Sequence, residues 1–234
     1  MPGRVSSVRD RLREGRRLQG TFVKLPAAEV VEIAAETLDF VVIDLEHSQL
    51  TEGDALRLVR HAWALGFPAL VRVHELDRAL VNRVLEAGAA GIQLSSVRSS
   101  AEVEALREAC LYAPAGTRSV SLAHGPARYG ATALADYLGA VEPPLVVAQI
   151  ETAATDDPLD AILGAGPDVA FVGVTDLAVE YGLDEQRVRA RVDEVAGAAD
   201  AAGVAFGGFG DDDRYRYAIA SSDVALLRKA YAGG

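Results

Sequence analysis

Short apolar runs alternate with longer amphipathic stretches along almost the whole chain. The runs are rich in Val, Ile and Phe, and most are nearly continuous in apolar character, which is typical of strands buried on both faces of a parallel sheet. The run at 118–122 fits this pattern least well. The pattern predicts eight strands, at 20–25, 39–44, 69–73, 91–95, 118–122, 145–151, 169–174 and 204–209.

Helical periodicity fills the segments between these runs. Thr51 is placed to cap one helix and Gly66 to end it, because a Thr side chain accepts from first-turn N–H groups and glycine adopts the left-handed conformation easily. The segment 112–144 is less regular and predicts long loops with one short helix at 133–139. The other predicted helices lie at 27–38, 51–66, 76–88, 100–113, 156–166 and 184–203.

The alternation of strands and helices predicts the fold class. Eight strands and about as many helices in 234 residues correspond to an α/β fold, the (β/α)8 or TIM barrel, with residues 1–234 forming a single domain. A doubly wound open sheet is the alternative. Such sheets usually have fewer strands, so the count favours a closed barrel.

Composition narrows the function classes. The net charge of -11 disfavours nucleic acid as a partner, because an acidic surface repels phosphate backbones. The single cysteine, Cys110, excludes an intrachain disulfide and a multi-cysteine zinc site. No apolar run is long enough to span a membrane, and the charged N-terminus lacks the apolar stretch of a signal peptide. We therefore expect a cytoplasmic protein with no membrane partner.

Polar residues end or follow several of the predicted strands. In a barrel the carboxyl ends of the strands form one rim, where active sites lie. Residues far apart in the sequence can therefore be neighbours at this rim. The candidates, in chain order, are Asp44, Glu46, His47, Arg72, Gln149, Glu151, Thr175 and Asp176.

These residue types suggest chemistry next to a carbonyl group. Glu151 and Asp176, from adjacent strands, could supply two oxygen ligands to a divalent metal, which would offset the cost of placing acids in a closed mouth. His47 could act as a base held in one tautomer by Asp44. Arg72 could bind a carboxylate or stabilise an enolate oxygen.

Each candidate also has a structural interpretation. An acid at a strand end often caps the next helix or belongs to a turn, as Asp176 and Glu151 could. A single histidine is often structural or exposed; His61 fits that description, while His74 and His124 are ambiguous. The functional interpretation rests on the joint placement of the polar groups.

At these residues the chain resembles the HpcH/HpaI family of metal-dependent pyruvate aldolases. The resemblance covers about 8–182 and continues more weakly to the end. It is carried by GTFVKLPAAEVVEIAAETLDFVVIDLEH (20–47), LVRVHELDRALVNRVLEAGAAGIQL (70–94), YAPAGTRSV (112–120), ARYG (127–130), VVAQIET (146–152) and FVGVTDLAVEYG (171–182).

The resemblance implies a role for each candidate. Glu151 and Asp176 match the metal ligands, for Mg²⁺, Mn²⁺ or Co²⁺. His47 matches the catalytic base and Asp44 its carboxylate partner, while Arg72 matches the arginine that contacts the keto oxygen and stabilises the enolate. Glu46 matches the acid near the metal's water ligand, and Gln149 matches a residue that lines the pyruvate site. The backbone around Thr175 and Asp176 would receive the pyruvate carboxylate.

The resemblance also implies an assembly and a substrate class. Family members are usually hexamers built from dimers that exchange C-terminal helices, which here would be about 210–234. The substrates would be pyruvate or another 2-oxo acid with an aldehyde. Departures from the family pattern bear on the aldehyde pocket and the oligomer: Ser48–Gln49, Ser95–Ser96, Ser119, Val174 and a shorter C-terminal region.

Several activities are compatible with these residues. The first is a class II aldolase that adds a pyruvate enolate to an aldehyde or cleaves a 4-hydroxy-2-oxo acid. Oxaloacetate decarboxylation or an acyl-CoA lyase reaction would use related enolate chemistry. A Schiff-base aldolase would need Lys24, which leaves Glu151 and Asp176 unexplained. A non-catalytic barrel is the last alternative, and the retained acid, histidine and arginine residues count against it.

Overall fold

The computed structural model describes residues 7–233 and contains a closed barrel of eight parallel strands. Each strand pairs with its neighbours in chain order, and β1 pairs with β8 to close the ring. The predicted barrel is confirmed and the open sheet is excluded. The strands are β1 (Leu18–Val23), β2 (Phe40–Asp44), β3 (Ala69–Val73), β4 (Gly91–Leu94), β5 (Leu145–Ile150), β6 (Val169–Val172), β7 (Ala205–Phe209) and β8 (Tyr217–Ser222).

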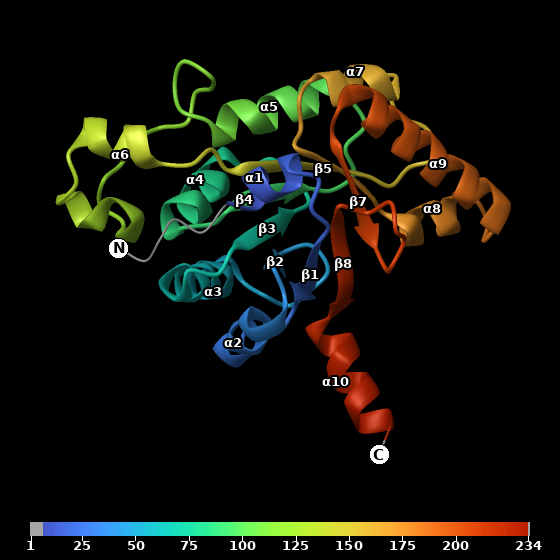
Figure 1. The fold of residues 1–234 in the computed structure, drawn as a ribbon, viewed down its shortest axis with the longest axis horizontal. Coiled ribbons are helices and arrows are strands. Elements are labelled where there is room, and N and C mark those ends of the chain that lie inside the picture. The colour runs from blue at the N-terminus through green and yellow to red at the C-terminus, as the bar shows by residue number, and fades with distance from the viewer. Residues whose placement is uncertain (1–6, 234) are drawn as a thin grey trace.

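Helices surround this barrel, while α10 extends away from it at the C-terminal end of the chain (Figure 1). No helix among residues 7–233 is long and apolar enough to cross a membrane. The helices are α1 (Val8–Arg13), α2 (Ala28–Thr37), α3 (Glu52–Leu65), α4 (Arg78–Ala87), α5 (Ser100–Cys110), η1 (Gly125–Gly130), α6 (Leu134–Ala140), α7 (Leu159–Gly164), α8 (Val174–Glu180), α9 (Glu185–Ala202) and α10 (Asp223–Ala232).

The barrel interior is filled by large side chains. Phe40 stacks on Tyr217 with ring centroids 4.4 Å apart. Gly20 makes this packing possible, because a Cβ atom there would lie 2.4 Å from the Phe40 ring. A second apolar layer lies between the barrel and its helices, so both faces of the strands are buried, as their continuous apolar runs predict.

Local signals set the ends of the helices. The Thr51 side chain accepts from the Asp54 N–H group, and Asp54 bonds back to the Thr51 N–H group in a capping box. Gly66 ends the same helix in the left-handed conformation, with φ of 70°. Both predictions are confirmed, as is the irregular segment 112–144 with its short helix, α6.

The prediction of a strand at 118–122 is wrong. Strand β4 pairs directly with β5, Gly91 opposite Leu145, so no strand lies between them. The segment instead lies outside the ladder, with the Arg118 guanidinium over the Tyr112 ring at 4.6 Å. The eighth strand is β8, which sequence inspection missed because its apolar part is short. The predicted sixth, seventh and eighth strands are therefore β5, β6 and β7.

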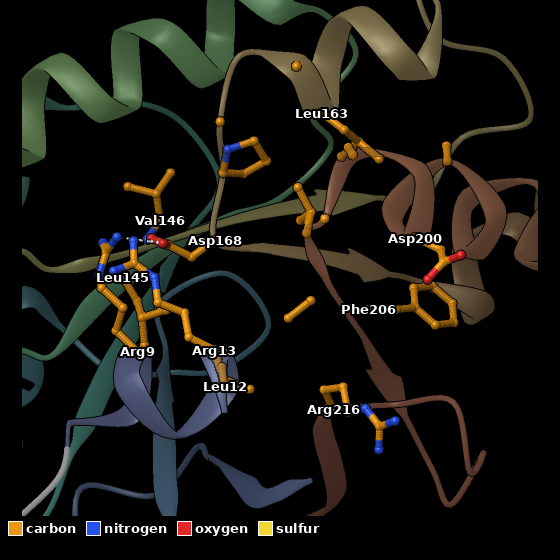
Figure 2. A pocket seen from close by; sticks show the side chains of 18 of the residues that line it. Arg9, Leu12, Arg13, Leu145, Val146, Leu163, Asp168, Asp200, Phe206 and Arg216 are labelled. Atoms are coloured by element: carbon orange, nitrogen blue, oxygen red, sulfur yellow. Dashed lines mark hydrogen bonds and ion pairs between the residues drawn. The ribbon is translucent and has the colours of Figure 1, made fainter. Parts of the chain in front are cut away.

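A groove of about 1200 Å³ lies at the amino ends of the strands, beside α1, α7 and α9 (Figure 2). In it the Arg9 Nη1 atom lies 2.5 Å from Asp168 Oδ1, and Asp168 also accepts from the Val146 N–H group at 2.9 Å. These contacts join α1 to the base of the barrel. The lining includes none of the candidate residues, which lie at the opposite end.

Candidate active site

Four of the candidate side chains are buried at the carboxyl ends of strands. Asp44 ends β2, Arg72 lies near the end of β3, and Gln149 and Glu151 lie at the end of β5. Each is no more than 6% exposed. The closed barrel therefore brings together residues from three strands, as expected from the position of each at the end of an apolar run.

Asp44 lies between two cations. The Arg72 guanidinium donates to both carboxylate oxygens, Nε to Oδ1 at 2.9 Å and Nη2 to Oδ2 at 2.7 Å. The Lys24 Nζ atom lies 2.7 Å from Oδ2. Burial by itself would raise the pKa of Asp44, but hydrogen bonds and charge from Arg72, with the hydrogen bond from Lys24, hold that pKa well below its usual range. The Asp44 carboxylate is therefore ionised, and both of its oxygens are bound by neighbouring side chains.

Glu46 collects several polar groups around one carboxylate. Ser95 Oγ donates to its Oε1 atom at 2.7 Å, and His74 Nδ1 lies 3.2 Å from the same oxygen. Arg72 Nε lies 3.4 Å from Oε2. With a side chain only 9% exposed, Glu46 lies beside the Asp44–Arg72 pair and links it to the end of β4.

His47 is placed differently from the prediction. Asp44 Oδ1 accepts from the His47 backbone N–H group at 3.2 Å. The side chains that bind the Asp44 carboxylate are those of Arg72 and Lys24. The carboxylate nearest the His47 ring is Glu46, with Nε2 and Oε2 3.9 Å apart. The expected side-chain pair of His47 with Asp44 is thus not formed, because two cations already occupy Asp44. The His47 ring is 58% exposed at the mouth.

Glu151 is held from two sides. Ser96 donates to its Oε1 atom through both the backbone N–H group, at 2.8 Å, and Oγ, at 2.7 Å. Gln149 Nε2 donates to Oε2. Gln93 donates to Gln149 Oε1 at 2.6 Å and accepts from the Tyr217 hydroxyl at 3.3 Å. A buried polar chain thus crosses the barrel interior from β8 to Glu151.

Thr175 and Asp176 lie in the first turn of α8 and are exposed. Gly173, which precedes this helix, lies against Glu151; a Cβ atom there would be 2.5 Å from Glu151 Oε2. This close approach brings the turn that carries Asp176 near Glu151. Among residues 7–233 the Asp176 carboxylate forms no hydrogen bond or ion pair, so its oxygens are available to a ligand.

The donor set fits a hard divalent cation with an incomplete protein shell. Within the described part of the chain, no group of three or more His, Cys, Asp or Glu side chains surrounds one point. Two carboxylates, such as those of Glu151 and Asp176, would leave the other ligand positions of a bound cation to water and to substrate oxygens. Mg²⁺ and Mn²⁺ accept such oxygen-rich sites, which usually retain several waters.

Some residues of the site were not singled out from the sequence. Gln93 and Tyr217 point into the barrel, and only their strand positions could have indicated this. Ser95 and Ser96 were noted as departures from the family pattern, and His74 was left ambiguous. The partners of these three residues are Glu46, which follows β2, and Glu151, which follows β5. Both are distant in sequence, so no local signal reveals these contacts.

Fold and site together define a (β/α)8-barrel protein with acids, an arginine and a histidine at the carboxyl end of the barrel. The model of the HpcH/HpaI aldolase/citrate lyase family matches residues 18–220. The chain belongs to this family, as the sequence motifs indicated, and is an enzyme of the class II aldolase type.

Named relatives agree with this assignment. A hydroxypyruvate/pyruvate aldolase of Rhizorhabdus wittichii is 32% identical over 243 residues, covering 97% of this chain and 96% of that protein. A 2-keto-3-deoxy-L-rhamnonate aldolase of Salmonella gallinarum is 29% identical, covering 74% of this chain and 66% of that protein. The crystal structure of an HpcH/HpaI aldolase from Desulfitobacterium hafniense, 28% identical, superposes with a TM-score of 0.88 over 98% of this chain and 95% of that one.

Proposed function

We propose that this chain is a divalent-metal-dependent aldolase that forms the enolate of pyruvate and adds it to an aldehyde, or releases it from a 4-hydroxy-2-oxo acid. One observation carries the proposal. Contacts run without a break from Arg72 through Glu46 to Ser95, and from the adjacent Ser96 to Glu151. The proposed enolate-stabilising arginine and the proposed metal ligand therefore belong to one connected site.

Arg72 stabilises the negative charge that develops on the carbonyl oxygen. Its Nε and Nη2 atoms are bound to Asp44, whereas Nη1 forms no hydrogen bond among residues 7–233. The remaining N–H groups can therefore point to a substrate oxygen. A guanidinium that is already oriented by Asp44 needs little rearrangement when the charge forms, which is the condition for electrostatic stabilisation.

His47 removes the proton from the methyl group of pyruvate. Its exposed ring can reach a substrate in the mouth, and the backbone around it is held by Asp44, through the His47 N–H group, and by Lys24, which donates to the His47 carbonyl oxygen at 2.9 Å. Glu46, 3.9 Å from the ring, is the carboxylate that supports the protonated form.

Glu151 and Asp176 hold the divalent cation, which is Mg²⁺, Mn²⁺ or Co²⁺. The metal supplies Lewis acidity toward the 2-oxo acid when it is bound. Gln149 keeps Glu151 in place from within the barrel and lines the pyruvate site. The N–H groups of Thr175 and Asp176, which have no partner among the described residues, receive the substrate carboxylate.

The contacts of Lys24 favour this mechanism over a Schiff base. Lys24 Nζ lies 2.7 Å from Asp44 Oδ2 and donates to the His47 carbonyl oxygen. A lysine that attacks a carbonyl needs a free amine lone pair and access to the substrate, whereas both contacts of this Nζ atom are with oxygen atoms of the protein. Lys24 therefore has a structural partner rather than the surroundings of a nucleophile.

Exchange of the pyruvate methyl protons tests the proposed function. The protein is mixed with pyruvate in D₂O, and loss of the methyl proton signal is followed by NMR with Mg²⁺ or Mn²⁺ and then with EDTA. We expect exchange that needs the metal and stops with the chelator. No exchange with any divalent metal would overturn the proposal.

We also propose that residues 1–234 form one barrel domain, of which residues 1–6 and 234 lie outside the described part. We propose further that the C-terminal segment, about 210–234, is exchanged between copies in a homohexamer. Helix α10 projects from the barrel (Figure 1) and exposes Val224, Leu226, Leu227 and Tyr231. Its start is anchored by Asp223, which accepts from the Lys24 and Leu25 N–H groups at 2.9 Å. Light scattering of the full chain and of a chain ending at 222 tests the assembly, which should dissociate on truncation.

A further inference from the structure

Ser96 makes an unusual pair of contacts with Glu151. Its backbone N–H group and its hydroxyl both donate to the same oxygen, Oε1, at 2.8 and 2.7 Å. The other oxygen, Oε2, accepts from Gln149 Nε2. The Glu151 carboxylate is thus held at both ends, from β5 by Gln149 and from the end of β4 by Ser96.

The backbone of Ser96 is in the left-handed region, with φ of 53°. This conformation is uncommon for a residue other than glycine, and in folded proteins it persists where surrounding contacts hold it. Here it directs both donors of one residue at one acceptor. The two contacts with Glu151, together with the hydrogen bond from the Val97 N–H group to the Gln149 carbonyl oxygen at 2.9 Å, fix the backbone around this residue.

The preceding serine has a different partner. Ser95 Oγ donates to Glu46 Oε1 at 2.7 Å, whereas Ser96 Oγ donates to Glu151. Both serines stand where the family resemblance leads us to expect a proline-containing segment. Adjacent hydroxyls thus serve two separate carboxylates, and each can be removed without touching the other.

We propose that Ser96 is a positioning residue that orients Glu151 for metal binding in this chain. The inference rests on the proposed function, which makes Glu151 a ligand. A carboxylate fixed by donors on both oxygens loses little orientational freedom when the cation binds. Without the hydroxyl, the side chain rotates more freely, and binding must restrict it. Loss of such a supporting hydrogen bond typically weakens metal binding about 10- to 100-fold.

The test compares Ser96→Gly with Ser95→Ala in the full-length protein. Glycine suits a φ of 53° and keeps the N–H donor, so Ser96→Gly removes only the hydroxyl contact. Mn²⁺ binding without substrate is measured by calorimetry or by the EPR signal of the free ion. We expect the Kd to rise about tenfold or more in Ser96→Gly, and to change by less than about threefold in Ser95→Ala.

Two further variants complete the design. Ser96→Ala also lacks the hydroxyl and should weaken Mn²⁺ binding in the same direction, which covers the case in which Ser96→Gly fails to fold. Glu151→Gln should abolish binding at this site. Thermal melting without metal confirms that each variant is folded before its Kd is interpreted.

The outcomes separate the two proposals. If the wild type binds Mn²⁺, Glu151→Gln does not, and the folded Ser96 variants bind as tightly as the wild type, the role of Ser96 is overturned while the metal-dependent function stands. If the wild type does not bind Mn²⁺, or Glu151→Gln binds it equally well, the ligand assignment fails, and the inference about Ser96 fails with it.

Discussion

Asp44 on β2 and Arg72 on β3 are opposite one another in the sheet register, and the Arg72 guanidinium binds both oxygens of the Asp44 carboxylate. Both side chains are buried. Breaking a buried pair by removing one partner leaves an uncompensated charge, which is much more costly than breaking a pair at the surface. The two residues therefore serve the fold and the site together.

Asp44→Asn should lower the free energy of unfolding at pH 7 by about 3–5 kcal/mol, because Arg72 and Lys24 would lose the carboxylate that binds both, which leaves only Glu46, at 3.4 Å, beside Arg72. The folded-state pKa of Asp44 is depressed, so its stabilising contribution is present above its unfolded-state pKa of about 4 and is lost as pH falls toward the folded-state value. Urea unfolding at pH 7 and at lower pH should show the gap between wild type and variant shrinking in acid.

A surface ion pair provides the control for Asp44. Asp156 binds Arg98 at 2.9 Å, but both side chains are largely exposed. Asp156→Asn should change stability far less than Asp44→Asn, because water screens an exposed pair. Equal losses in the two variants would contradict the special role of the buried pair.

His47→Ala should slow metal-dependent exchange of the pyruvate methyl protons about 10²- to 10⁴-fold, the range typical of a positioned general base. Mn²⁺ affinity should stay near the wild-type value, because Glu151 and Asp176 are unchanged. His74→Ala is the matched comparison. His74 also lies beside Glu46, at 3.2 Å, and should have the smaller effect. Lost metal binding in His47→Ala, or a larger effect of His74→Ala, would argue against His47 as the base.

Positions along the chain were predicted better than contacts between chain segments. Asp44, Arg72 and Glu151 were placed at one rim because each lies at the end of an apolar run, and closure of the barrel brings such ends together. The run at 118–122 was mistaken for a strand, since short apolar runs look alike wherever they fold. Strand β8 was not predicted because its apolar part, Tyr217–Ala220, is short and is followed by two serines.

Side-chain pairing within the site could not be predicted. Nearness in sequence suggested that Asp44 would support the His47 ring. The barrel instead gives Asp44 two charged partners, Arg72 from the next strand and Lys24 from the segment between β1 and α2. Both carboxylate oxygens of Asp44 are already bound by these two side chains, so the His47 ring forms no pair with them. Such choices depend on the register between strands, and residue spacing does not encode that register.

Lys24→Arg tests the Schiff-base alternative. Arginine keeps a positive charge beside Asp44 but does not form an imine with a carbonyl. We expect this variant to retain metal-dependent methyl exchange, and the wild type to survive borohydride treatment in the presence of pyruvate. Mass spectrometry would detect a reduced adduct. A trapped pyruvate adduct on Lys24, together with exchange that resists EDTA, would favour the imine mechanism.

Cys110 should be inert in the folded protein. It ends α5 with no exposed surface, and burial raises the pKa of its thiol to about 12. The thiolate is the nucleophile that attacks a disulfide reagent, so at about pH 8 the reagent cannot reach the buried sulfur and the sulfur is not ionised to attack it. The native protein should show almost no thiol release with such a reagent, whereas one thiol per chain should react promptly in guanidinium.

Because reaction of native Cys110 requires opening of α5, a destabilised variant such as Asp44→Asn should be labelled faster than the wild type under native conditions. Rapid labelling of the wild type, at the same rate with and without denaturant, would show that α5 does not protect Cys110.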